Sequence, residues 1–147
     1  MKRFVFSLEK LLHFRIFKEK QAEILLGKKT AECERIDIAL KALAEKYKNS
    51  LYDLQPEKGN LHSASYFIDA QNYLTALNTK KEQLLTERVH AEMEREEARQ
   101  VYIAAHREKE IISKLKEKKH REWKKLQQRE EDNNLDDFVN TKYNVEE

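Results

Sequence analysis

The sequence contains few of the residues that interrupt helices. Its 147 residues include two glycines and one proline, too few for the many tight turns of a sheet protein. Charged residues make up 38% of the chain and hydrophobic residues 39%, so it lacks the apolar content of a thick core. These scarcities predict long helices with very few breaks.

Several kinds of site are absent from the sequence as well. Cys33 is the only cysteine, which excludes an intramolecular disulfide and favours a reducing compartment. No apolar run approaches the roughly 20 residues of a membrane span, and no cleavage site of a signal peptide follows the basic start. The motifs GxxxxGK[ST], GxGxxG, GxSxG and HExxH do not occur. We therefore expect no enzyme, no bound cofactor and no metal site.

One break divides the chain. Pro56 cannot donate a helical hydrogen bond and Gly59 tolerates a positive φ, so a turn is expected there. Ser7 is a candidate cap for the first helix, and Ser63 or Ser65 for the second. The predicted organisation is a single coiled-coil domain with a helix over about 8–54, a turn over about 55–63, a helix over about 66–131 and a frayed tail over about 132–147.

Both predicted helices carry an apolar seam with heptad spacing. In the first arm, ten of fourteen seam positions are apolar: Leu8, Leu12, Arg15, Glu19, Ala22, Leu26, Lys29, Cys33, Ile36, Leu40, Leu43, Tyr47, Ser50 and Leu54. The second arm has one apolar column: Ala70, Leu77, Leu84, Ala91, Ala98, Ala105, Ile112, Lys119 and Leu126. Its companion column is mixed and includes Tyr73, Val101 and Leu115. A short connection favours antiparallel packing, so the sequence predicts an all-α, two-helix antiparallel coiled coil.

The most basic stretch spans residues 114–129, where eight Lys or Arg surround Trp123. Three interpretations stay open: a solvated helix face, docking to an acidic protein surface, and contact with nucleic-acid phosphates. The spacing Glu-x-x-His occurs at Glu87–His90 and Glu117–His120, as in di-iron bundles. The two copies lie roughly 45 Å apart on one helix, so we interpret them as ordinary surface residues.

Aromatic residues gather at two places. Phe4, Phe6, Phe14 and Phe17 lie near the start and either cap the end of the coiled coil or form an exposed interface. A second group flanks the turn and either packs together across it or forms another docking patch: Tyr47, Tyr52, Tyr66, Phe67 and Tyr73.

Over nearly its whole length the chain resembles the flagellar type III export protein family FliJ. Three stretches carry the resemblance, in the order expected. They are FVFSLEKLLHFRIFKEKQAEILLGKK at the start, SYFIDAQNYLTALNTKKEQL in the middle and AHREKEIISKLKEKKHREWKKLQQREEDNNLDD near the end. Ile111, Ile112 and Ser113 depart from the more charged segment that many members have.

The resemblance implies an antiparallel coiled coil similar to the central stalk of rotary ATPases. It implies a non-catalytic protein that binds the hexameric export ATPase, the export-gate membrane protein and export chaperones. ATPase docking maps onto Leu8, Leu12, Arg15, Phe17, Arg121, Lys124, Lys125 and Arg129. Gate docking maps onto Leu43, Tyr47, Tyr73 and Leu77. The implied location is the cytoplasm, peripheral to the membrane at the flagellar base, with a monomer when free and no nucleic acid bound.

Three alternatives compete with this hypothesis. A generic structural coiled coil would pair its arms between chains, and its solution mass would be that of a dimer. A nucleic-acid binder would use residues 114–129 and bind DNA or RNA in a salt-dependent way. A stalk protein of virulence-type secretion would share the architecture of the flagellar protein.

Overall fold

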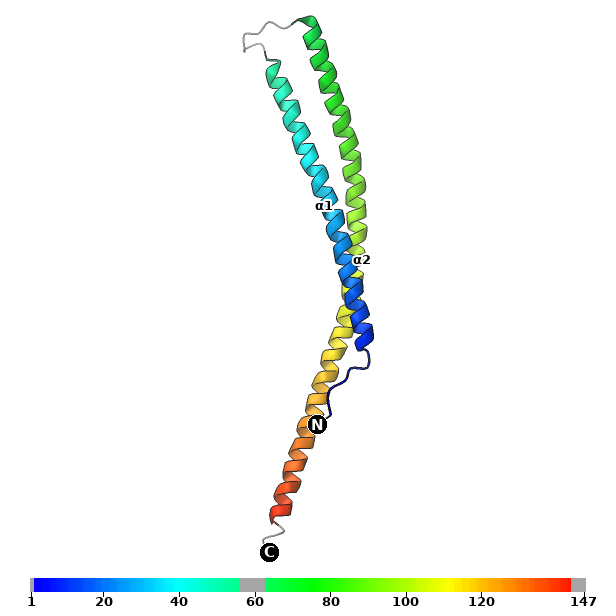
Figure 1. Ribbon diagram of the computed structural model, residues 1–147, viewed down its shortest axis with the longest axis vertical. Coiled ribbons are helices and arrows are strands. Elements are labelled where there is room, and N and C mark those ends of the chain that lie inside the picture. Colours follow the sequence, from blue (N-terminus) through cyan, green and yellow to red (C-terminus); the bar gives the residue numbers. More distant parts are fainter. Residues whose placement is uncertain (1, 56–62, 144–147) are drawn as a thin grey trace. The chain divides into compact units, whose positions relative to one another are not determined.

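The chain folds into two long helices joined in sequence by the expected break. The computed structural model describes residues 2–55 and 63–143, so the predicted turn at Pro56 and Gly59 lies outside the described residues. Helix α1 spans Glu9–Asp53 (45 residues) and helix α2 spans Ala64–Tyr143 (80 residues) (Figure 1). The described residues contain no strand. The prediction of an all-α fold with two long helices is confirmed.

The helix ends are closed by short local hydrogen bonds. The Ser63 hydroxyl accepts a hydrogen bond from the Tyr66 amide at 3.3 Å, so Ser63 is the cap of α2 and satisfies one of its free N–H groups. At the start of α1 the backbone carbonyl of Phe6 accepts from the Glu9 amide at 3.2 Å. The Phe6 carbonyl, and not the Ser7 hydroxyl, therefore accepts this hydrogen bond at the start of α1.

Helix α2 ends at Tyr143, well beyond the predicted end near residue 131. The heptad pattern stops at Leu126, but a helix needs no seam to continue, and no proline or glycine follows Gly59 to break it. The Thr141 hydroxyl donates to the Asp137 carbonyl one turn earlier, at 2.7 Å. Residues 127–143 thus extend the helix, and the fraying of its last turns stays a prediction.

The contacts divide the chain into two compact units, and the organisation as a single coiled-coil domain stays a prediction. The terminal unit consists of Met1–Gln21 and Ile103–Glu147, and the central unit is Ala22–Tyr102. In each unit a segment of α1 lies along a segment of α2 that runs in the opposite direction (Figure 1). Each unit is described by itself below.

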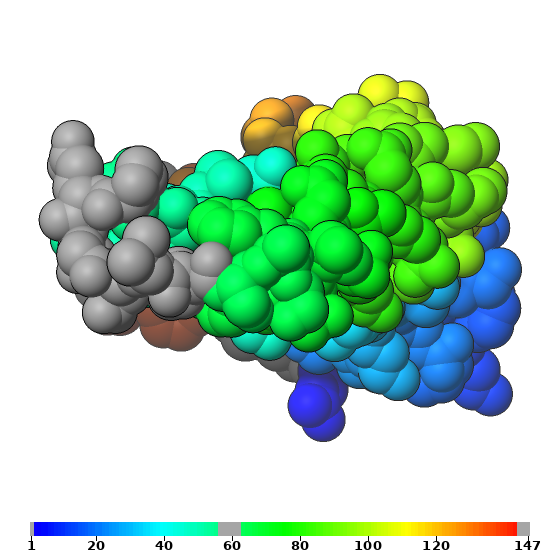
Figure 2. Space-filling model, turned by 90° about the horizontal axis from the view of Figure 1, so that it is seen from above, coloured from blue at the N-terminus to red at the C-terminus, as the bar shows by residue number. Residues whose placement is uncertain are grey.

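The core of the central unit comes from the predicted heptad columns. Cys33 and Ile36, 1% and 2% exposed, pack with Ala91, and Leu40 covers them. In the space-filling view from above, the start of α2 (green) faces the viewer, and parts of α1 (cyan and blue) are visible beside it (Figure 2). The remaining buried residues of this unit are Ala22, Leu74, Leu77, Leu84 and Ala98. Every one except Leu74 belongs to a column read from the sequence, which confirms the register of α1 and the apolar column of α2.

The companion column of α2 was wrong by one residue. Tyr73 and Val101 are exposed, whereas Leu74 is buried. Leu115 of the predicted column is half-buried. The column from Leu74 passes the exposed Lys81 and then continues through half-buried residues: Arg88, Arg95, Tyr102, Lys109, Lys116 and Trp123. Because the heptad pattern was traced through apolar residues, it did not mark the charged members. Their long aliphatic stems can cover the seam while the charges stay near water.

Candidate protein-docking surfaces

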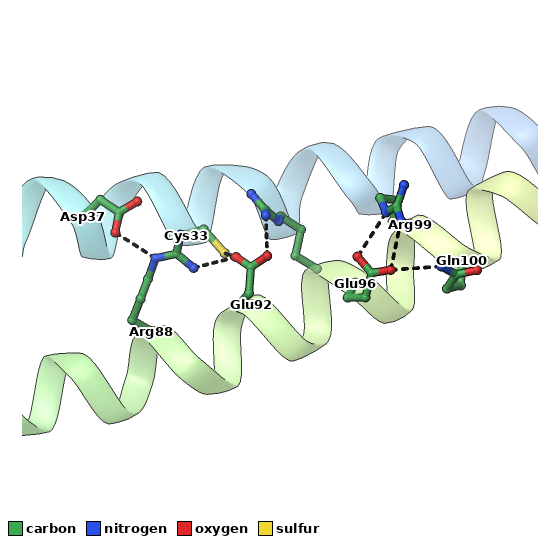
Figure 3. Close-up of polar contacts among 8 residues, drawn as sticks. Cys33, Asp37, Arg88, Glu92, Glu96, Arg99 and Gln100 are labelled. Carbon is green, nitrogen blue, oxygen red and sulfur yellow. Dashed lines mark hydrogen bonds and ion pairs between the residues drawn. The ribbon is translucent and has the colours of Figure 1, made fainter.

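A network of ion pairs ties α1 to α2 in the central unit (Figure 3). The Arg88 guanidinium donates to Asp37 of α1 and to Glu92 of its own helix, at 2.7 Å each. Glu92 also accepts from Arg95, and the Cys33 thiol lies 4.0 Å from it. Hydrogen bonding to Arg88 lowers the pKa of both Asp37 and Glu92. The Arg88–Asp37 pair crosses between the helices and holds the register of the seam.

An apolar groove opens between the helices on the turn side of this network. Its volume is about 260 Å³. The lining residues are Leu40, Leu43, Ala44 and Tyr47 from α1, with Leu77, Asn78, Lys81 and Leu85 from α2. Three of the four residues predicted to dock the export gate, Leu43, Tyr47 and Leu77, therefore line one groove. Leu77 is buried and forms part of the packing, so Leu43 and Tyr47, which are half-buried, are the more accessible of these three residues.

The fourth predicted gate residue, Tyr73, lies outside this groove. It is 48% exposed and lines a second hollow of about 220 Å³. The other lining residues are Ser50, Asp53, Leu54, Tyr66, Asp69 and Ala70. The aromatic group around the turn is thus divided, with Tyr47 in the groove and Tyr66 and Tyr73 in the second hollow. The rings of Tyr66 and Phe67 meet edge to face, with centroids 6.1 Å apart.

Ion pairs also join the two helices in the terminal unit. Lys116 lies 2.8 Å from Glu9, and Lys109 lies 3.1 Å from Glu19. Glu19 also contacts His106 Nδ1 at 2.9 Å, and Arg15 pairs with Glu108. Partial burial alone would raise the pKa of Glu19, but its bonds to Lys109 and His106 lower the pKa instead. Carboxylates and cations thus alternate along this part of the seam.

The predicted ATPase-docking residues of α1 differ in accessibility. Leu12 is buried and Leu8 is half-buried. Arg15 is engaged by Glu108. Phe17, by contrast, is 57% exposed. Leu8, Leu12 and Arg15 therefore hold α1 on α2, and only Phe17 is largely open to a partner.

On α2 the predicted docking cations belong to a longer stripe. Lys114, Lys118, Arg121, Lys125 and Arg129, here called the basic stripe, are all exposed. Their spacing of three or four residues places them within about 80° of one another around the helix. Lys116 and Trp123, which are half-buried, lie on the opposite side. The basic stripe therefore lies on the side of α2 away from the seam.

The basic stripe lacks acidic partners within the described residues. Of the eight Lys or Arg over 114–129, Lys116 pairs with Glu9 and Lys119 with Glu122. All five residues of the basic stripe remain unpaired in the described part of the chain, and so does Lys124, which lies about 100° away around the helix. Lys114 and Lys118 were missed by the resemblance, although the helical spacing of all five residues is visible in the sequence.

The aromatic residues near the start have different surroundings. Phe4 meets His120 edge to face at 5.0 Å between ring centroids and also contacts Trp123 at 5.8 Å. His120 stacks on Trp123, again at 5.8 Å. Phe6 is buried, whereas Phe14 and Phe17 are exposed. The cluster is thus partly a cap on α2 and partly open surface.

The remaining sequence motifs form no recognised site in the described residues. Over residues 2–55 and 63–143 no group of three or more His, Cys, Asp or Glu is arranged to hold a metal ion. The same part of the chain has no helix that is both long and apolar enough to cross a membrane.

Comparison with known proteins identifies the family. The searches of curated proteins and of solved structures gave no match. The family model described as the flagellar FliJ protein matches residues 4–147, essentially the whole chain. The chain therefore belongs to the FliJ family, whose members have a role associated with flagellar protein export.

Proposed function

We propose that this protein binds the hexameric flagellar export ATPase as a central stalk, promotes its assembly and activity, and couples it to the export gate and substrate chaperones. The observation that supports this role best is the basic stripe. Five unpaired cations on one helix face would be attracted to acidic loops lining a ring of subunits. The exposed ring of Phe17 supplies an apolar contact on the other arm.

The groove in the central unit is the proposed contact for the gate. Its lining is largely apolar, and Leu43 and Tyr47 offer a leucine and an aromatic side chain to a partner. Tyr73 in the neighbouring hollow extends this surface. The protein itself catalyses nothing in this proposal. It acts in the cytoplasm, at the membrane face of the flagellar base, through its partners.

The proposal is tested by ATP hydrolysis of the cognate export ATPase at increasing concentrations of this protein. Wild type is expected to stimulate hydrolysis. The variant Arg121→Glu/Lys125→Glu/Arg129→Glu is expected to need a roughly tenfold or higher concentration for half-maximal stimulation, because each exposed charge contact contributes about 0.5–1 kcal/mol. Higher salt should weaken the wild-type effect in the same direction.

A matched control makes the same change of charge elsewhere. Lys46, Lys48 and Lys80 are exposed cations of the central unit with no ion pair in the described residues. The variant Lys46→Glu/Lys48→Glu/Lys80→Glu should stimulate like wild type. Leu43→Ala/Tyr47→Ala should also stimulate hydrolysis but lose binding to the cytoplasmic domain of the gate protein. Equal stimulation by both triple variants would refute docking through the basic stripe.

A further inference from the structure

Different kinds of contact stabilise the helix pairing within each of the two units. Within the described residues, the terminal unit buries only Phe6 and Leu12, whereas the central unit buries eight residues. Apolar burial is the main stabilising contribution to helix pairing in water. The first part of α1 therefore depends more on polar contacts than the rest of the helix does.

Dissolved salt should weaken those polar contacts, because they are partly exposed to solvent. The pairs Glu9–Lys116, Glu19–Lys109 and Arg15–Glu108 connect residues 9–21 of α1 to α2, and each has partly exposed side chains. Half-exposed ion pairs are individually weak, and dissolved salt weakens them further. A thirteen-residue helical segment without packing partners is only marginally stable in water. Loss of these pairs would leave Leu12 as the one buried residue that holds residues 9–21 on α2, so the segment would separate from α2 and unfold more often.

A ring contact closes the same segment at its outer end. Phe4 lies against His120 and Trp123 of α2. Trp123 is the only tryptophan in the chain. Its fluorescence therefore reports whether Phe4 is in place.

We infer that residues 2–21 form a strap, held on α2 by ion pairs, by the Phe4 contact and by the few apolar contacts of Phe6 and Leu12, which opens while the central unit stays folded. Opening frees Lys116 from Glu9 and Lys109 from Glu19, although Lys109 keeps Glu110 of its own helix, and it uncovers the α2 face that carries Trp123. When the strap is open, α2 therefore offers more cations to an acidic partner than when the strap is closed. The strap is a property of the free chain, and it does not rest on the proposed function.

The test is amide hydrogen exchange of the full chain between about 0.1 M and about 1 M NaCl, over which the Debye length falls from about 10 Å to about 3 Å. Residues 9–21 are expected to exchange faster as salt rises, whereas residues 29–45 are expected to change little. The Trp123 emission should change over the same range. Equal acceleration in both segments, or none in residues 9–21, would overturn the inference.

A pair of matched variants locates the effect. Glu9→Gln/Glu19→Gln removes two cross-helix carboxylates from the strap, and Asp37→Asn/Glu94→Gln removes two from the central unit. The first variant should exchange residues 9–21 roughly two- to thirtyfold faster at low salt, the range expected for two exposed pairs. The second should leave that segment unchanged. Phe4→Ala, which touches no ion pair, should also speed exchange in residues 9–21 and alter the Trp123 emission. An unchanged rate in both strap variants would contradict the strap.

Discussion

Arg88 illustrates how a charged residue can occupy a seam between helices. Its side chain is about one quarter exposed, and its guanidinium bonds Asp37 across the seam and Glu92 on its own helix. These bonds raise the pKa of Arg88, so its charge is permanent. A leucine here would bury more apolar area but would leave Asp37 without its partner. Arg88 therefore fixes which turn of α1 lies opposite which turn of α2.

Gly27, unlike Arg88, makes no contact that depends on its identity, because nothing around it requires a glycine. It lies inside α1 with an exposed surface, and an added Cβ would meet no atom within 4 Å. Glycine in a helix interior costs about 1 kcal/mol relative to alanine. Gly27→Ala is therefore expected to raise the free energy of unfolding by about 1 kcal/mol, measured by urea denaturation. Ala31→Gly, one turn further on and also exposed, should lower it by a similar amount. A Gly27→Ala protein no more stable than wild type would mean that a partner or a bend needs the glycine.

At the scale of the helices, the seam positions occupied by apolar residues could be predicted from the sequence. The seam positions occupied by charged residues could not. The seam of α1 could be read because residues such as Leu12, Cys33 and Ile36 recur with heptad spacing. The second column of α2 could not, because Arg88 and Lys109 look like surface residues until their partners are known. The end of α2 was missed for a related reason, since a helix without a seam leaves no pattern.

The candidate surfaces were predictable to different degrees. The resemblance named Leu43, Tyr47 and Leu77, which the fold brings together in one groove. It also named Leu12 and Arg15, whose side chains turn out to be occupied within the terminal unit. Local spacing alone can place residues on one face of a helix, but burial depends on the partner helix. Residue identity alone therefore does not tell which of the predicted docking residues are accessible, and the docking roles stay predictions.

The pairing of the helices should weaken in acid. Asp37, Glu92 and Glu19 have lowered pKa values when folded, so the unfolded chain binds more protons in the acid range. Their stabilising effect is complete above the ordinary values of 3.8 and 4.5 and is lost as pH falls through the lower folded values. The melting temperature should therefore fall below about pH 4.5.

A single variant separates this effect from general acid denaturation. Asp37→Asn should melt below wild type at about pH 7, and the gap should narrow as the pH falls, because protonation of Asp37 removes the same charge. Asp69→Asn, which removes an exposed carboxylate with no ion pair in the described residues, should track wild type throughout. A constant gap between Asp37→Asn and wild type across this range would show that the Arg88 bond does not depend on charge.

At the scale of the whole molecule, the charges of α2 favour pairing between α2 and α1 of the same chain over pairing between two chains. The seam column of α2 contains Arg88, Lys109 and Lys116, which meet carboxylates supplied by α1, and Arg95, whose partner is Glu92 of its own helix. A second α2 helix in the place of α1 would bring cations against cations. We therefore expect a single chain of 17.6 kDa by sedimentation equilibrium.

Removing the repulsion should change that result. Arg88→Leu/Arg95→Leu should shift the sedimenting mass towards two chains, because a leucine column pairs readily with another copy. Arg99→Leu, which changes an exposed arginine outside the column, should remain a single chain. A wild-type mass of two chains would contradict the expectation that α1 and α2 of one chain pair with each other.

The cationic column of α2 has a consequence for life in a crowded cell, where many proteins expose leucine-rich helices. A seam built only of leucine would accept almost any of them, and the outcome would depend on abundance. Here the complementary carboxylates are carried by the same polypeptide, so the correct neighbour is always present at a fixed local concentration. A foreign helix would have to reproduce the spacing of Glu9, Glu19 and Asp37 to compete. Fidelity of assembly is thus encoded in residues that contribute little to the size of the core.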